Sequence, residues 1–339
     1  MTPSPGGTER RDGSVPPFAF ASELLAEPSA RLAAALAFVA AALVLAKGSD
    51  AMGQATLNGL VSAGYYALGA VGLTLIFGIL RLVNFAHGDM LTFGAYAAVG
   101  GMAAGLPFWA ASIVAIAASA VVAVATDIVV WEPLRRKRAS TLQLFLVAIG
   151  IALILRYSVQ FFGGGQIRSI GLDTLSSLQI GPWRLGTLQF AVLVVGILVI
   201  VIVGLALRFT RLGKELRALS DNMALAEVSG IDTIRSVRIT WAVAGALAGL
   251  AGILYAAAIG SINPNFGITI LLSLFASAVL GGIGNAYGAL AGGIVLGLSQ
   301  EWSTLFFNPR WKPAVGFVIL ILTLLFMPRG IFGRRRTRL

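Results

Sequence analysis

The chain has 339 residues, of which 58% are hydrophobic and only 12% are charged. An average soluble domain has roughly 25% charged residues, so this composition indicates a protein that lies in lipid. The net charge of +11 does not indicate nucleic acid binding, because the basic residues fall between apolar runs, as in the cytoplasmic loops of membrane proteins. The absence of cysteine excludes disulfides, thiolate nucleophiles and cysteine metal sites.

The first 30 residues are polar and show no apolar period, so we expect a flexible cytoplasmic tail at 1–30. Ten apolar runs follow, and we expect each to form a transmembrane helix. For the first run, the alternative is the hydrophobic core (h-region) of a signal peptide. The runs are 32–46, 57–80, 90–106, 108–130, 142–162, 188–207, 239–259, 268–280, 286–306 and 314–327. The short run at 268–280 ends in glycine, which indicates a broken or re-entrant element.

Basic residues set the expected orientation of these spans. They cluster at 135–138, 208–238 and 334–338, and ten spans that start inside place 19 of the 25 lysines and arginines in the cytoplasm. The sequence therefore predicts an all-α polytopic membrane protein with both termini cytoplasmic, a transmembrane permease domain at 31–328 and a basic tail at 329–339. The longest external loop, 163–187, is expected to form an ordered turn near the membrane interface.

Soluble catalytic machinery is absent from the sequence. No aqueous segment exceeds about 30 residues, no P-loop motif of the form G-x-x-x-x-G-K-[ST] occurs, and His87 is the sole histidine. We expect no cofactor on this chain and no enzymatic activity. If ATP powers its function, separate subunits must hydrolyse the ATP.

Four polar residues are candidates for a pathway or gate through the membrane: Asn58, Asn84, His87 and Asn285. Asn84 and His87 lie in a polar stretch between two apolar runs, which predicts a non-helical segment lining a pathway. The alternative is a capped loop, with Asn84 or Asp89 as the helix N-cap and His87 in solvent. Asn285 lies in a similar glycine-rich break, as expected of two related repeats.

Glycine spacing near the second break also predicts close helix crossings. Gly284 and Gly288 are four residues apart, as are Gly293 and Gly297. Such small faces let membrane helices approach closely.

The basic segment 208–238 contains an apolar stretch that predicts a short helix. Asp221 or Asn222 is placed to cap it, and Gly230 to end it in the left-handed conformation. The helix is expected to expose four apolar side chains, Met223, Leu225, Ala226 and Val228. It either lies flat on its own membrane domain or docks a motor subunit.

Several motifs resemble the permeases of branched-chain amino acid ABC importers of the LivH type over about residues 54–328. The residues that carry the resemblance are Leu57-Asn58-Gly59, Tyr66-Ala67-Leu68, the run 72–79, Asn84-Phe85-Ala86-His87-Gly88, Gly94-Ala95-Tyr96, the segment 213–231 and the run 279–284. The resemblance implies two cytoplasmic ATP-binding subunits, a second related permease or a self-dimer, and a periplasmic or lipoprotein substrate-binding protein. It also implies an ATPase-coupling loop that includes Gly213, Arg217, Ala218, Asp221, Asn222, Ala226 and Gly230.

The expected function is that of an inner-membrane permease working by alternating access. Branched-chain amino acids are the default substrate, and urea, short amides and aromatic acids, which close relatives transport, are alternatives. An ion-coupled secondary transporter and a membrane scaffold are the competing classes. A proton-coupled carrier normally needs a central carboxylate or histidine relay. Asp127 and Glu301 lie near the ends of their apolar runs, where we expect them to snorkel or to pair locally.

Overall fold

The structure, a computed structural model, describes residues 28–332. All ten apolar runs coincide with helices. These are α2 (Pro28–Lys47), α3 (Ser49–Leu80), α4 (Ala86–Ala103), α5 (Phe108–Thr126), α7 (Thr141–Gly163), α8 (Thr187–Phe209), α11 (Thr233–Ile259), α12 (Phe266–Gly281), α13 (Ala286–Ser303) and α14 (Lys312–Phe326). The tails expected at 1–30 and 329–339 lie outside the described residues, apart from 28–30 and 329–332.

Within this part of the chain, six helical segments are long and apolar enough to cross a membrane. They are Ser49–Leu80, Phe108–Arg136, Thr141–Gly163, Thr187–Phe209, Thr233–Ile259 and Pro309–Phe326. The second joins α5 to α6 (Glu132–Arg136) through a π-helical turn, η1 (Asp127–Trp131), and the last includes the 3-10 turn η2 (Pro309–Trp311). The chain is therefore a polytopic helical membrane protein, and the count of ten spans stays a prediction.

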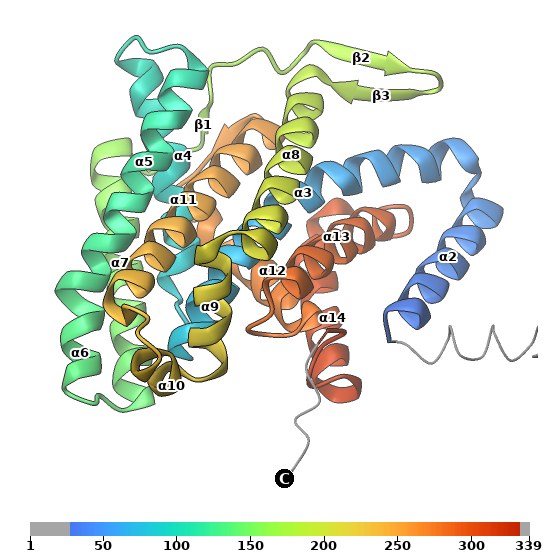
Figure 1. Cartoon of the computed structure of the whole chain (residues 1–339). Coiled ribbons are helices and arrows are strands. Elements are labelled where there is room, and N and C mark those ends of the chain that lie inside the picture. The colour runs from blue at the N-terminus through green and yellow to red at the C-terminus, as the bar shows by residue number, and fades with distance from the viewer. Residues whose placement is uncertain (1–27, 333–339) are drawn as a thin grey trace, which may run out of the picture.

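Helix α3 lies at the centre of the bundle and packs against α8, α11, α12 and α13 (Figure 1). Its crossing with α13 depends on glycine, as the spacing predicted. A Cβ atom added at Gly293 would lie 2.4 Å from the Cα of Ala67, and one at Gly297 would lie 2.6 Å from the backbone nitrogen of Ala63. Both distances are below van der Waals contact, so only glycine permits this approach of the two backbones.

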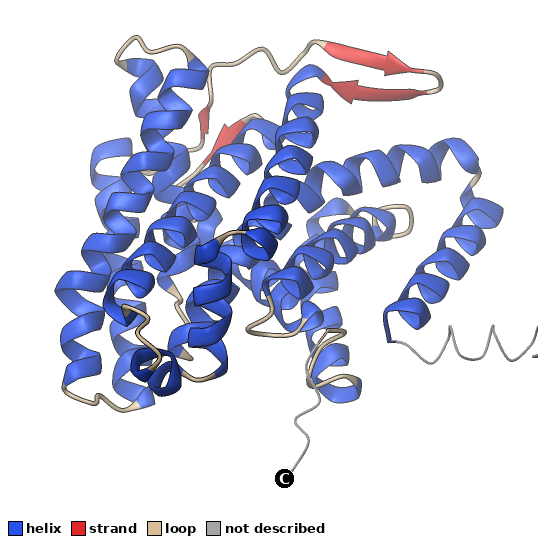
Figure 2. Ribbon diagram, viewed as in Figure 1, coloured by secondary structure: helices blue, strands red, loops and turns tan. Residues whose placement is uncertain are grey.

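The two ends of the bundle differ (Figures 1 and 2). One, which we call the basic end, carries α6 and the consecutive helices α9 (Arg211–Asp221) and α10 (Met223–Val228). The other, the hairpin end, carries the antiparallel strands β2 (Ser177–Ile180) and β3 (Trp183–Gly186). Strand β1 (Arg168–Ser169) pairs with β4 (Ser261–Ile262). The 163–187 loop is thus ordered as expected, but the all-α prediction was wrong there because it missed these short strands.

Two helix breaks meet toward the basic end. Residues 81–85 separate α3 from α4, and residues 282–285 separate α12 from α13. A Cβ added at Gly78, near the first break, would lie 3.3 Å from the Cα of Gly284 in the second. The final described residues, 328–332, which we call the C-terminal strap, cover the second break: the N–H groups of Ile331 and Phe332 donate to the carbonyls of Leu280 and Gly281 at 2.8 and 3.2 Å.

Candidate functional site

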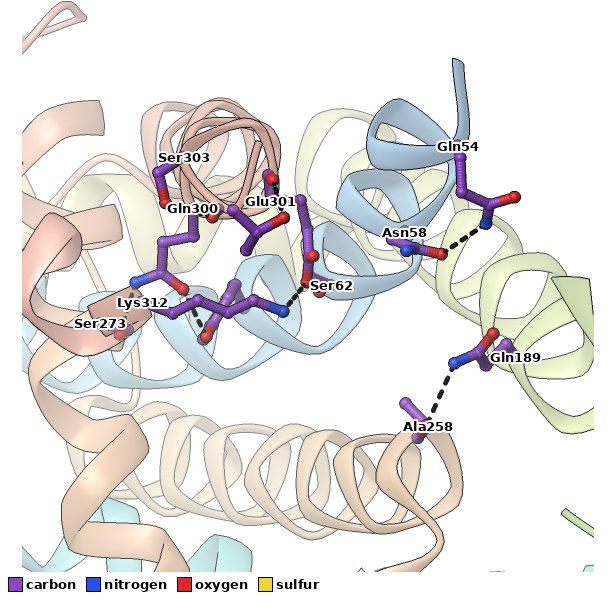
Figure 3. A network of polar contacts seen from close by, with 12 residues as sticks. Gln54, Asn58, Ser62, Gln189, Ala258, Ser273, Gln300, Glu301, Ser303 and Lys312 are labelled. Carbon is purple, nitrogen blue, oxygen red and sulfur yellow. Dashed lines mark hydrogen bonds and ion pairs between the residues drawn. The ribbon is translucent and has the colours of Figure 1, made fainter. Parts of the chain in front are cut away.

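A cavity of about 400 Å³ opens toward the hairpin end, between α3, α8, α11, α12, α13 and the start of α14. Its wall is mixed in character: aliphatic side chains such as Val61 and Ile270 alternate with tyrosines, hydroxyls and charged groups. The polar lining residues that form its hydrogen-bond network come from helices far apart in the sequence (Figure 3). Small-molecule sites typically combine an apolar wall with a few convergent polar groups in roughly 300–1,000 Å³. The cavity has that composition and lies at the low end of that size range.

Glu301 is the centre of the first hydrogen-bond chain in the cavity. Its Oε1 atom accepts a hydrogen bond from Ser62 Oγ at 3.0 Å and one from Lys312 Nζ at 2.6 Å. Tyr65 in turn donates its hydroxyl to Ser62 Oγ at 2.9 Å. Glu301 itself is only 7% exposed, and a carboxylate so buried needs such partners to remain charged. The expectation of a local pair at Glu301 is confirmed.

A second chain of hydrogen bonds runs beside the first. The Tyr66 hydroxyl donates to Gln300 Oε1 at 2.7 Å, and Gln300 Nε2 donates to Ser273 Oγ at 3.1 Å. Tyr255 packs edge-on against Tyr65, with ring centroids 5.3 Å apart. These contacts fix the tyrosines of α3 in one orientation, because each hydroxyl has a buried partner.

Of the four predicted pathway residues, Asn58 lines this cavity. It lies one helical turn before Ser62, and its Oδ1 accepts a hydrogen bond from Gln54 Nε2 at 3.2 Å (Figure 3). The other three lie elsewhere, so the structure does not bring the four together.

Asn84 lies in the first helix break and His87 in the first turn of α4, and both are 0% exposed. Asn84 Oδ1 accepts the backbone N–H of Ala86 at 3.1 Å, which forms an Asx turn just before α4, whose N-cap is Phe85. His87 Nε2 donates to the carbonyl of Gly69 at 2.9 Å. The chain is non-helical only at residues 81–85, shorter than predicted, because α4 already begins at Ala86. The alternative that placed His87 in solvent is wrong, and the prediction that this segment lines a pathway stays a prediction.

Asn285 acts as the N-cap of α13. Its Oδ1 accepts the N–H groups of Tyr287 and Gly288 at 3.1 and 3.2 Å, while its Nδ2 donates to the carbonyl of Phe332 in the C-terminal strap at 3.1 Å. The side chain therefore joins the second break to the strap. Asn285 lies 16 positions before Glu301, at the opposite end of α13 from the cavity.

Two further carboxylates pair with arginines away from the cavity. Asp89 on α4 forms an ion pair with Arg156 on α7 at 2.9 Å, and Asp127 pairs with Arg135 at 2.8 Å. Both carboxylates are 1% exposed. The local pair expected for Asp127 is confirmed, and neither pair shares a residue with the cavity wall.

The coupling segment predicted at 213–230 forms two helices, α9 and α10, where the sequence predicted one short helix. Thr210 caps α9 by accepting the N–H of Gly213 at 3.1 Å. Gly213 lies against α8, where an added Cβ would be 2.2 Å from the carbonyl oxygen of Leu207. Of the other predicted coupling residues on α9, Arg217 and Asp221 are exposed and Ala218 is half-buried. The helix is thus fixed against the bundle on one side and open on the other.

Helix α10 begins and ends where the sequence predicted. Asn222 Oδ1 accepts the N–H of Leu225 at 3.1 Å, and Gly230 adopts a φ of 85° after the helix. Leu225 and Val228 are 60% and 82% exposed. The expectation that Ala226 is also exposed was wrong: it is 4% exposed because it packs into the bundle core and anchors the helix.

Helix α9 also contacts the first helix break. Ser220 Oγ donates a hydrogen bond to the carbonyl of Gly78 at 3.1 Å. Because Gly78 adjoins Gly284, one side chain of the coupling segment touches the place where the two breaks meet.

The polar cluster of the cavity was not predicted from the sequence. Glu301 and Asn58 were predicted separately, without a connection to Ser62, Gln300 or Lys312. One signal was present: adjacent Gln300 and Glu301 in an apolar helix, followed by Lys312 at the start of the next apolar run. Polar and charged residues in spanning segments usually face a bundle interior or cavity.

Known proteins share this sequence pattern. Residues 55–324 match the family model described as branched-chain amino acid transport system / permease component. The chain is 32% identical over 300 residues to the high-affinity branched-chain amino acid transport system permease protein LivH of Escherichia coli K12, covering 83% of this chain and 95% of that protein. The equivalent BraD of Pseudomonas aeruginosa is 30% identical, with the same coverages. The ribose import permease protein RbsC of Escherichia coli K12 is 29% identical over 76% of this chain and 81% of its own length.

Proposed function

The chain belongs to the family of branched-chain amino acid transport system permease components, and from that premise we propose that it forms the transport pathway of an ATP-driven importer of branched-chain amino acids. It is a transport subunit of the inner membrane and not itself an enzyme. In the proposal all ten helices span the membrane and both termini are cytoplasmic. The basic end then faces the cytoplasm, in keeping with the preference of lysine and arginine for that side.

The observation that carries the proposal is the exposed apolar face of α10. Leu225 and Val228 project from a short helix at the basic end, while Ala226 holds that helix against the bundle. An apolar face on a short aqueous helix normally requires a covering partner. We assign this partner as one of two cytoplasmic ATP-binding subunits, with α9 and α10 as the coupling segment.

The proposed assembly contains a second permease as well, either a related chain or a copy of this one, and a periplasmic or lipoprotein binding protein that delivers the substrate. ATP-driven closure of the motor subunits would move the α9–α10 segments, and alternating access would open the pathway from the cavity to the cytoplasm. Asn58, Asn84, His87 and Asn285 are the proposed pathway or gate residues. Asn58 faces the entrance, and the other three belong to the parts that must move.

The experiment is co-purification of the tagged chain from its own host in mild detergent, followed by identification of the bound proteins. We expect a P-loop ATPase in the wild-type complex and at least about a tenfold loss of it in a Leu225→Asp, Val228→Asp double variant, since a buried unpaired charge costs several kcal/mol. Leu178→Asp is the matched control, because Leu178 is exposed to 42% at the hairpin end and should leave the ATPase bound.

Two outcomes would contradict the proposal. If the double variant retains the ATPase as well as the control does, α10 is not the docking helix. If the chain is recovered alone from several detergents and the purified chain accumulates substrate in response to an ion gradient, it is a secondary transporter.

A further inference from the structure

The cavity at the hairpin end carries both signs of charge on its wall. Glu301 on α13 supplies a carboxylate. Arg310 in η2 and Lys312 at the start of α14 supply two cations. The Lys312 side chain is 30% exposed, so the ion pair that it makes with Glu301 faces the cavity. Among the described residues, Arg310 makes no ion pair with any carboxylate.

The carboxylate of Glu301 is only half used. Both of its hydrogen bonds, from Ser62 and from Lys312, go to Oε1. No described residue donates to Oε2. This atom is not among the fully buried side-chain atoms that lack a hydrogen-bond partner, so it is accessible from the cavity. One carboxylate oxygen is therefore open to a donor that the protein does not supply.

A purely structural explanation for this cluster is weak. The desolvation of two buried charges offsets much of their attraction, so a buried ion pair adds little net stability and gives little reason to place a glutamate in a membrane helix. Charged residues in spanning segments usually mark a substrate or ion pathway. The same wall offers apolar surface at Val61, Ile259 and Ile270, so charge and hydrocarbon lie side by side.

We propose that this cluster binds the zwitterionic backbone of an α-amino acid on its way through the membrane. The ammonium group of the solute donates to Glu301, its carboxylate lies between Lys312 and Arg310, and its aliphatic side chain packs against Val61, Ile259 and Ile270. Charge-assisted hydrogen bonds of both signs would then select a zwitterion over a neutral solute of similar size. The inference rests on the proposed import function and adds a selective site within the permease itself.

The first test measures uptake of radioactive leucine by the assembled complex, with its ATPases and binding protein, in proteoliposomes. Glu301→Gln keeps the shape of the side chain and removes the charge, and we expect it to lower uptake at least about tenfold. The charge-reversed pair Glu301→Lys with Lys312→Glu keeps an ion pair between α13 and α14, so it should assemble normally and still transport poorly. Asp127→Asn is the matched control, since it also neutralises a buried carboxylate paired with an arginine and should keep uptake near the wild-type rate.

The second test reads binding directly and does not depend on a variant at Glu301. Because the natural chain has no cysteine, a Thr269→Cys substitution places a single reactive thiol on the cavity wall. We expect millimolar leucine to slow labelling of this thiol in the complex without binding protein. Isopentylamine, which lacks the carboxylate, and 4-methylpentanoate, which lacks the ammonium, should protect it much less.

The outcomes separate this inference from the proposed function. A wild-type complex that takes up no leucine would contradict the import function itself. Leucine uptake that is unchanged by Glu301→Gln, or equal protection by leucine and both analogues, would overturn the zwitterion site and leave the import function standing. Recovery of uptake in the charge-reversed pair to the wild-type rate would assign the cluster a structural role only.

Discussion

The two ends of this pathway are built from different kinds of contact. At the hairpin end, side chains such as Glu301, Ser62 and Lys312 line a cavity and bond to one another. At the basic end, the breaks in the helices meet through backbone, with Gly78 against Gly284. Side chains can exchange a protein partner for a solute by rotating, whereas backbone contacts separate only if whole helices move. From this comparison we propose that the hairpin end is a binding end and the basic end a gating end.

The largest effect is expected where the two ends are joined, at the crossing of α3 and α13. Gly293→Val would drive a branched side chain into the backbone at Ala67, where even a Cβ would lie 2.4 Å from Cα. Overpacking costs roughly 1–3 kcal/mol and sometimes more, so the protein should be less stable and both ends should be affected. The measurement is the yield of monodisperse protein and its thermal stability in detergent.

Gly204→Val is the matched control for that variant. Gly204 lies on α8 with no atom within 4 Å of an added Cβ, so the same substitution should leave yield and stability unchanged. Equal loss in both variants would mean that valine is harmful for reasons other than the crossing.

A smaller effect, limited to the gating end, is expected at the C-terminal strap. Gly330 has a φ of 69°, and an added Cβ would lie 2.4 Å from the backbone nitrogen of Gly282. Gly330→Ala therefore combines a left-handed backbone, costing about 1–2 kcal/mol, with a steric clash that should lift the strap. Hydrogen exchange should become faster at the amides of residues 282–285, while the cavity at the hairpin end stays unchanged.

The control for the strap separates backbone strain from the clash. Gly171 has a φ of 71° and open space around its Cβ position, so Gly171→Ala carries the strain alone. If the amides of residues 282–285 exchange equally slowly in both variants, the strap does not hold the second break closed.

What the sequence could predict follows from the range of the interactions involved. Apolar runs, the cap at Asn222 and the left-handed Gly230 are local features, and each appears where the sequence placed it. The Glu301 cluster is different, because Ser62 lies 239 positions from Glu301. Whether two such residues face each other depends on how α3 and α13 are rotated about their axes, and this is set by packing at their glycines.

Ala226 shows the same limit on a smaller scale. Its apolar neighbours Leu225 and Val228 are exposed as expected, yet Ala226 is buried. A two-turn helix has one face toward the bundle, and composition alone did not identify which residue occupied it. The sequence therefore located the coupling segment but not its anchored face.

The smallest effect is expected at a hydrogen bond between the gating end and the coupling segment. Ser220 on α9 donates to the carbonyl of Gly78 at 3.1 Å, and Ser220→Ala removes that bond and nothing else of comparable size. A neutral hydrogen bond contributes about 0.5–1.5 kcal/mol, so we expect uptake to fall at most about twofold to tenfold, with ATPase binding unchanged because the apolar face of α10 is intact. Ser229→Ala is the matched control, since Ser229 Oγ, at the C-cap of α10, donates only locally, to the carbonyl of Leu225 at 2.7 Å.

A lower uptake per ATP hydrolysed in Ser220→Ala alone would identify the Ser220–Gly78 bond as a mechanical link from the coupling segment to the gate. Identical behaviour of the two variants would show that motion reaches the gate by another contact.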